Sequence, residues 1–287
     1  MTLTQDQIEF YRKNGYLLLE NVIARETIEK IRTVVNGFID KSRSAEASDA
    51  VYDLDPGHSA DNPCVRRLKD PHTLDPVFFD LSRDNVIVDA VAALLGGTVR
   101  FDHSKLNFKP TGSDASIQWH QDWAFYPYTN DDLLAVGVMI EDCTETNGPL
   151  MVVPGSHKGP VYDHHLDGWF AGGISDETAT EFTGEAVNLT GKAGSITLHH
   201  VRTLHASANN LSDRERPLLL FGYAAVDAFP VFDRYDLEEF NSRILRGEPV
   251  VEGRMEPAPV RLPWPRKPGA DSIYDNQAEL RSISAQT

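Results

Sequence analysis

The chain has 287 residues, of which 41% are hydrophobic, so it is long enough to bury a large core in a single domain. Its 43 acidic and 27 basic residues give a formal charge of −16, which argues against nucleic acid or an anionic membrane as a partner. Two cysteines, Cys64 and Cys143, do not suggest a disulfide framework. The polar N-terminus lacks a signal pattern, and no 18-residue apolar run occurs, so we expect a cytoplasmic protein.

The first third of the chain is predicted to be mainly helical. Thr4 is a suitable N-cap for a first helix, which Asn14-Gly15 would end, and residues 16–22 are typical of a strand. Apolar residues at helical spacing predict further helices over 24–41, 74–79 and 86–95. The polar stretch 42–63 is rich in Ser, Asp, Gly and Pro and predicts a long loop, which we interpret as a lid.

From Val99 the pattern changes to short strands separated by turn residues. We expect strands near 99–109, 117–122, 133–142, 150–153, 186–189, 195–199, 204–209 and 217–226. Eight such strands favour a mainly β fold with flanking helices, built on a double-stranded β-helix (a cupin-like jelly roll). We therefore expect one domain over 1–287, with a helical part (1–98), a jelly-roll core (99–226) and a C-terminal extension (227–287). A short helix (237–245) and a Pro-rich run (257–268) that wraps the domain are expected in the extension.

The segment Trp119-His120-Gln121-Asp122-Trp123 carries the clearest chemical signal. In an extended strand His120 and Asp122 would share one face, because side chains alternate. A later histidine, His205, could complete a set of two imidazoles and one carboxylate with open positions, which suits non-heme Fe(II). Arg216 follows His205 by eleven residues and could hold a carboxylate through two hydrogen bonds.

These residues, in this order and spacing, resemble the phytanoyl-CoA dioxygenase family of Fe(II)/2-oxoglutarate oxygenases. The resemblance extends over residues 1 to about 225 and includes Asn147-Gly148-Pro149-Leu150, Val153-Pro154-Gly155-Ser156-His157 and Thr203-Leu204-His205-Ala206-Ser207. It implies that His120, Asp122 and His205 are catalytic metal ligands for Fe(II). It further implies that 2-oxoglutarate is the co-substrate and that Arg216 anchors its distal carboxylate. Three further co-substrate contacts are expected, from Ser207, Asn107 and Gln121.

The resemblance also implies the reaction. A small-molecule substrate is hydroxylated at an unactivated carbon with O2, and succinate and CO2 are released. The carboxylate of Asp122 favours hydroxylation or desaturation, because related halogenases have Ala or Gly at this position. The alternatives are a cupin-like metalloprotein without 2-oxoglutarate, acting as an isomerase or hydrolase, and a metabolite sensor.

Several neighbouring residues admit two interpretations. Arg214 shares a strand face with Arg216 and competes with it, and Lys105 competes with Asn107. Aromatic residues after the motif, with His103, could line a substrate pocket or belong to the core; they are Trp123, Phe125 and Tyr126. The basic cluster Arg66, Arg67 and Lys69 could bind an anionic substrate, but we favour a solvated helix face.

Overall fold

A large antiparallel sheet forms one wall of the computed structural model, which describes residues 2–112, 115–232, 235–270 and 272–284. The strand order is β1-β11-β6-β13-β4-β3-β2, and β14 pairs with β4. These strands are β1 (Tyr16–Leu19), β2 (Tyr52–Leu54), β3 (Val65–Lys69), β4 (Val99–Asn107), β6 (Leu133–Met139), β11 (Ile196–His200), β13 (Leu218–Ala224) and β14 (Ile244–Arg246).

A smaller antiparallel sheet forms the facing wall, in the order β10-β7-β12-β5. Its strands are β5 (Ile117–His120), β7 (Leu150–Val152), β10 (Val187–Leu189) and β12 (His205–Ser207), and a separate hairpin pairs β8 (His165–Leu166) with β9 (Trp169–Phe170). Two sheets of this kind make a jelly roll, so the predicted fold class is confirmed.

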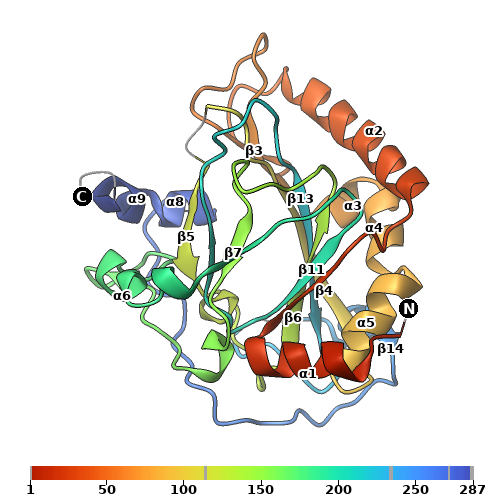
Figure 1. Cartoon of the computed structure of the whole chain (residues 1–287). Helices are drawn as coiled ribbons and strands as arrows, with labels where there is room; N and C mark the ends of the chain where they lie inside the picture. Colours follow the sequence, from red (N-terminus) through yellow and green to blue (C-terminus); the bar gives the residue numbers. More distant parts are fainter. Residues whose placement is uncertain (1, 113–114, 233–234, 271, 285–287) are drawn as a thin grey trace.

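Helices cover the outer face of the large sheet (Figure 1). They are α1 (Gln5–Asn14), α2 (Arg25–Ser42), α3 (Pro71–Leu74), α4 (Pro76–Ser82) and α5 (Asn85–Leu94). Ile31 of α2, Phe78 of α4 and Ile87 of α5 are fully buried in one cluster with Leu219 of β13. This apolar layer holds the sheet rigid behind the inner face.

Alternation along the strands separates the two faces of the large sheet. Leu68 and Leu106 are paired across β3 and β4 and are fully buried in the helix-side core. Their neighbours Arg67, Lys69 and Lys105 therefore point to the opposite side, toward the smaller sheet. The inner face of the large sheet therefore carries polar side chains that can contribute to a functional site between the two sheets.

Several sequence predictions of secondary structure differ from the structure. Residues 42–63 are not wholly a loop, because β2 lies inside the segment and pairs with β3. The basic cluster 66–69 belongs to β3 and not to a helix face, because this segment pairs with β2 on one side and β4 on the other. The expected helix 237–245 ends early, as α7 (Leu237–Ser242), and its last residues enter β14, which pairs with β4.

The remaining short elements lie in the long connections. They are the helix α6 (Asp176–Thr180) and the 3-10 turns η1 (Asp122–Ala124), η2 (Ser156–Lys158) and η3 (Thr183–Glu185). No helix among the described residues is both long and apolar enough to cross a membrane.

The C-terminal extension returns to the smaller sheet. Its final helices, α8 (Ile273–Asn276) and α9 (Ala278–Ser284), lie beside β5 (Figure 1). The buried Gln277 accepts a hydrogen bond from the backbone N–H of Gln118 at 2.9 Å and donates one to the carbonyl of Gly172 at 2.6 Å. The extension is thus hydrogen bonded to the strand that ends at His120.

Candidate active site

Two histidines face each other across paired strands of the smaller sheet. His205 on β12 is in direct register with His120 on β5, and their ring centroids are 4.0 Å apart. Both side chains are almost fully buried. The antiparallel register therefore brings together two imidazoles that are 85 positions apart in the sequence.

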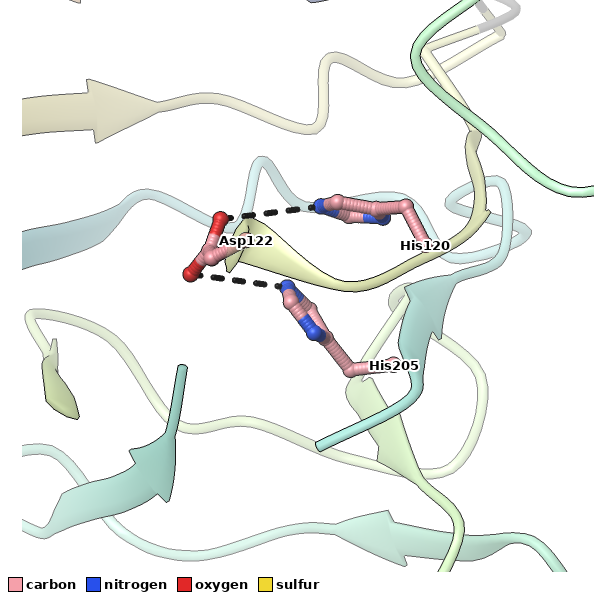
Figure 2. Close-up of side chains that lie close together, drawn as sticks. All are labelled: His120, Asp122 and His205. Carbon is pink, nitrogen blue, oxygen red and sulfur yellow. Dashed lines mark ion pairs between the residues drawn. The ribbon is translucent and has the colours of Figure 1, made fainter. Parts of the chain in front are cut away.

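Asp122 completes the group. Its two carboxylate oxygens lie 3.9 Å from Nε2 of His120 and 4.0 Å from Nε2 of His205, and Figure 2 shows one oxygen facing each ring. The ligand atoms of all three residues lie within 4.8 Å of one another. The expected strand 117–122 ends at His120, so the turn of η1, and not strand alternation, directs Asp122 toward the histidines.

Each histidine is held with Nε2 facing the centre of the group. Nδ1 of His120 is 2.8 Å from the carbonyl of Gln118, and Nδ1 of His205 is 2.9 Å from the carbonyl of Thr203. These carbonyls accept a hydrogen bond from the Nδ1–H group, which leaves Nε2 with a lone pair for a metal. Burial lowers the pKa of His120 to about 4 and the pKa of His205 well below its ordinary value. Both rings are therefore neutral at neutral pH, as metal ligands must be.

The backbone between the ligands is fixed by a histidine that the sequence did not single out for this role. The N–H of Gln121 donates to Nε2 of the buried His164 at 2.9 Å. The Gln121 side chain points away from the ligands. It donates to the carbonyls of Pro160 and Arg202 and accepts from the N–H of Tyr162. The predicted co-substrate contact of Gln121 does not fit this geometry, because other segments occupy its amide.

An inner cavity extends from the three ligands between the two sheets. Arg216 and Lys109 both line it, and they are 2% and 1% exposed. Their backbones are hydrogen bonded to each other, so two buried cations lie side by side. Nε of Arg216 has no hydrogen-bond partner in the described structure, and burial lowers the pKa of this guanidinium. A buried guanidinium with an unpartnered Nε fits an anionic ligand, and a dicarboxylate such as 2-oxoglutarate has the matching charge.

The other candidate co-substrate residues differ in whether they line the inner cavity. Ser207 and Asn107 line the inner cavity, as expected. Arg214, in contrast, is exposed and lines a different surface cleft. Lys109 was missed by sequence reasoning. The alternation that places Lys105 and Asn107 on the inner face would also have placed Lys109 there.

Polar groups from the large sheet surround Asp122. Lys105 lies 3.7 Å from one carboxylate oxygen, and Nε2 of His199 lies 3.6 Å from the other. Burial would raise the pKa of Asp122, but Lys105 and the three histidines lower it well below its ordinary value. Burial and the nearby Asp122 carboxylate raise the pKa of Tyr126 well above its ordinary value, so this phenol stays protonated.

A second, outer cavity of about 390 Å³ opens above Asp122. Phe125, Tyr126 and His103 line it, as predicted for a substrate pocket, and the Phe125 ring lies 5.7 Å from the His120 ring. Trp123 does not. It is 1% exposed, packs in a separate core cluster and donates from Nε1 to the carbonyl of Pro259, so its predicted role is corrected to a core residue.

A jelly roll with two histidines and one carboxylate at its centre, and buried cations beyond them, has the architecture of a non-heme iron oxygenase that uses a dicarboxylate co-substrate. Comparisons with known proteins agree. The family description Phytanoyl-CoA dioxygenase (PhyH) matches residues 11–218. The chain therefore belongs to the phytanoyl-CoA dioxygenase family.

Individual relatives support the same class. The chain is 37% identical to a probable alpha-ketoglutarate-dependent hypophosphite dioxygenase of Stutzerimonas stutzeri, over 96% of this chain and 97% of the relative. It is 31% identical to the L-proline trans-4-hydroxylase of Streptomyces griseoviridis, over 77% and 86% of the two chains. The crystal structure of EctD from S. alaskensis with bound Fe superposes with a TM-score of 0.68 at 24% identity, over 88% and 87%. This protein is an iron- and 2-oxoglutarate-dependent dioxygenase, which decides against the cupin-like and sensor alternatives.

Proposed function

We propose that His120, Asp122 and His205 hold the iron of this dioxygenase. The observation that carries the proposal is the convergence of their ligand atoms within 4.8 Å, with both Nδ1 atoms bound to backbone carbonyls. Three protein ligands on one side leave positions for a co-substrate and O2. The ammonium of Lys105 attracts the Asp122 carboxylate from 3.7 Å, and Nε2 of His199 faces its other oxygen at 3.6 Å.

We place 2-oxoglutarate in the inner cavity, with its distal carboxylate on Arg216. The unpartnered Nε of Arg216 offers a donor, and Lys109 adds a second cation. Ser207 and Asn107 provide further polar groups along the wall of this cavity. Bound iron and 2-oxoglutarate supply the oxidising chemistry, which consumes O2 and releases succinate and CO2.

The substrate that we propose is a small metabolite, hydroxylated in the outer cavity. A volume of about 390 Å³ is at the lower end of small-molecule sites, and the relatives are named for hypophosphite, L-proline and ectoine. Phe125 and Tyr126 would shield the reacting atom from water beside Asp122. The chain has two cysteines, which do not suggest a disulfide framework, and this fits a reducing compartment; we propose the cytoplasm.

Anaerobic titration tests the site assignment. Fe(II) and 2-oxoglutarate are added to the purified apoprotein, and the weak visible band of the chelate is followed. We expect the band in the wild type and its loss in Arg216→Gln at the same 2-oxoglutarate concentration. Arg214→Gln is the control, because it removes the same charge from an exposed position and should keep the band.

A wild-type protein that binds iron stoichiometrically without forming the band would overturn the assignment, as would a normal band in Arg216→Gln. Thermal unfolding of both variants shows whether they fold. Succinate release with hypophosphite, L-proline and ectoine then provides the first substrate comparison.

A further inference from the structure

The outer cavity collects positive charge in a protein that is strongly acidic. Its lining includes the cations Arg67, Lys69, Lys105 and Arg266. The acids of the same lining are the exposed Asp70 and the metal-ligand candidate Asp122. The whole chain has 43 acidic against 27 basic residues, so the local balance is the reverse of the overall one. Such a reversal in a cavity concentrates anions at that point.

Strand register shows that these cations are forced together. Lys69 on β3 is directly opposite Lys105 on β4, and Arg67 is directly opposite Asn107. Residues in register point to the same face, here the cavity side. Like charges directly opposite each other destabilise a sheet. Carboxylates of the protein or a bound anion must therefore offset this pair of lysines.

Among the described residues, two carboxylates lie within ion-pair distance of these four cations. Asp53 is shared, at 2.8 Å from Nζ of Lys69 and 3.8 Å from Nε of Arg67. In the part of the chain that the structure describes, Lys105 has one carboxylate within ion-pair distance, Asp122, which is also a proposed iron ligand. Arg266 has no carboxylate within ion-pair distance among the residues described, and its guanidinium lies over the ring of Phe170 at 5.7 Å.

We propose that the outer cavity binds the primary substrate as a small oxyanion, held by Arg67, Lys69 and Arg266, with Lys105 on the side of the iron ligands. The proposal rests on the proposed function, which places iron at the base of this cavity. Arg266 lies in the C-terminal extension, beyond residues 11–218 that match the family. In this proposal the extension completes the substrate site. The preference for an anion then depends partly on Arg266, a residue outside the part of the chain that matches the family.

Inorganic phosphate serves as a non-oxidisable probe. It is titrated by calorimetry into the anaerobic complex with Fe(II) and 2-oxoglutarate, at constant ionic strength, while the visible band is recorded. We expect saturable one-to-one binding that leaves the band in place. Loss of one charged contact in Arg266→Gln or Lys69→Gln should weaken phosphate binding by about tenfold or more.

Arg261→Gln is the matched control. It removes the same charge from the same extension, but Arg261 pairs with Asp163 and does not line the cavity. Phosphate affinity should stay within about twofold of the wild type, as expected for a screened distant charge. Lys69→Gln is a second variant from a different element, and thermal unfolding shows that each variant is folded.

The outcomes separate the two proposals. A normal band without saturable phosphate binding, or with equal affinity in Arg266→Gln, Lys69→Gln and Arg261→Gln, overturns the oxyanion site and leaves the iron site intact. Loss of the band on adding phosphate also counts against it, because phosphate would then occupy the co-substrate position. Absence of the band from the start contradicts the proposed function itself.

Discussion

His205 lies directly opposite His120 in the ladder between β12 and β5, and each ring is held by the backbone carbonyl two residues earlier in the chain. The two histidines thus have the same local arrangement, although Gln118 lies within β5 and Thr203 precedes β12. The third ligand comes from the turn that follows β5. Two rigid ligands and one ligand on a turn define the geometry before any metal binds, which lowers the cost of ordering the site.

The first prediction concerns metal affinity. His120→Ala or His205→Ala should weaken Fe(II) binding by more than about 100-fold. Loss of a residue that only hydrogen bonds to a metal ligand typically weakens metal binding by about 10- to 100-fold, and loss of a ligand itself should cost more. Anaerobic equilibrium dialysis measures the affinity, and circular dichroism shows that the fold persists. His157→Ala should bind iron normally, since His157 contacts the backbone of Arg12 and lies outside both cavities. Tight stoichiometric iron in both ligand variants would disprove the metal assignment.

The second prediction concerns acid stability. Burial lowers the pKa of His164 to about 4, whereas an unfolded histidine titrates near 6.5. Between these values the unfolded chain binds the proton and the folded chain does not, so stability is full above about pH 6.5 and falls as the pH decreases toward 4. One such histidine contributes a slope of up to about 1.4 kcal/mol per pH unit. His120 adds to it in the same direction.

Urea unfolding of the apoprotein between pH 7 and pH 5 measures this slope. His164→Gln should have a shallower slope than the wild type, because one buried neutral histidine is removed. It should also loosen the Gln121 backbone between the metal ligands, and so weaken iron binding at pH 7. Identical slopes in the two proteins would show that His164 takes up its proton equally in both states.

A glycine beside the co-substrate cavity supports the third prediction. Gly148 has φ +76°, an added Cβ would lie 2.6 Å from the carbonyl of Ala208, and its own carbonyl accepts a hydrogen bond from Arg216. Gly148→Ala should therefore lower stability and shift Arg216. Gly168 has a similar φ of +82° with open space around it, so Gly168→Ala measures the backbone strain alone.

We expect Gly148→Ala to lose about 1–3 kcal/mol more than Gly168→Ala and to bind 2-oxoglutarate more weakly. Urea unfolding and the chelate titration give the two quantities. Equal losses in both variants would mean that the contact with Ala208 relaxes at little cost.

Features that follow from neighbouring residues in the sequence could be predicted from local patterns. Strand periodicity located the jelly-roll strands, and the spacing of His120, Asp122, His205 and Arg216 indicated the chemistry. Tertiary contacts decided the rest. The strand β3 was missed because its apolar residues Val65 and Leu68 do not alternate and its strand character depends on pairing with β4, which is distant in sequence.

Functional residues outside the metal-ligand motif could not be predicted from sequence patterns for a similar reason. His164 and Lys109 carry no motif, and their roles arise only from the segments that fold against them. The C-terminal extension likewise matched no pattern, although Ile273 lines both cavities and Arg266 lines the outer one. Such roles depend on three-dimensional packing, which one sequence does not display.

The last prediction concerns this extension. Gln277 is fully buried and joins α8 and α9 to β5 through the N–H of Gln118 and the carbonyl of Gly172. Gln277→Ala leaves these two buried backbone groups without their partner, which costs about 1–3 kcal/mol for each group left unsatisfied. Because Ile273 on α8 lines the inner cavity, the variant should also bind 2-oxoglutarate more weakly.

Gln118→Ala is the matched control, since the Gln118 side chain makes no hydrogen bond among the residues described, and only its backbone joins the extension. Urea unfolding and 2-oxoglutarate titration of both variants separate a docking role of the extension from a general effect of losing a glutamine. If Gln277→Ala unfolds like the wild type and keeps its 2-oxoglutarate affinity, the extension is held by other contacts, and α8 does not depend on this hydrogen-bond pair for its position beside the cavity.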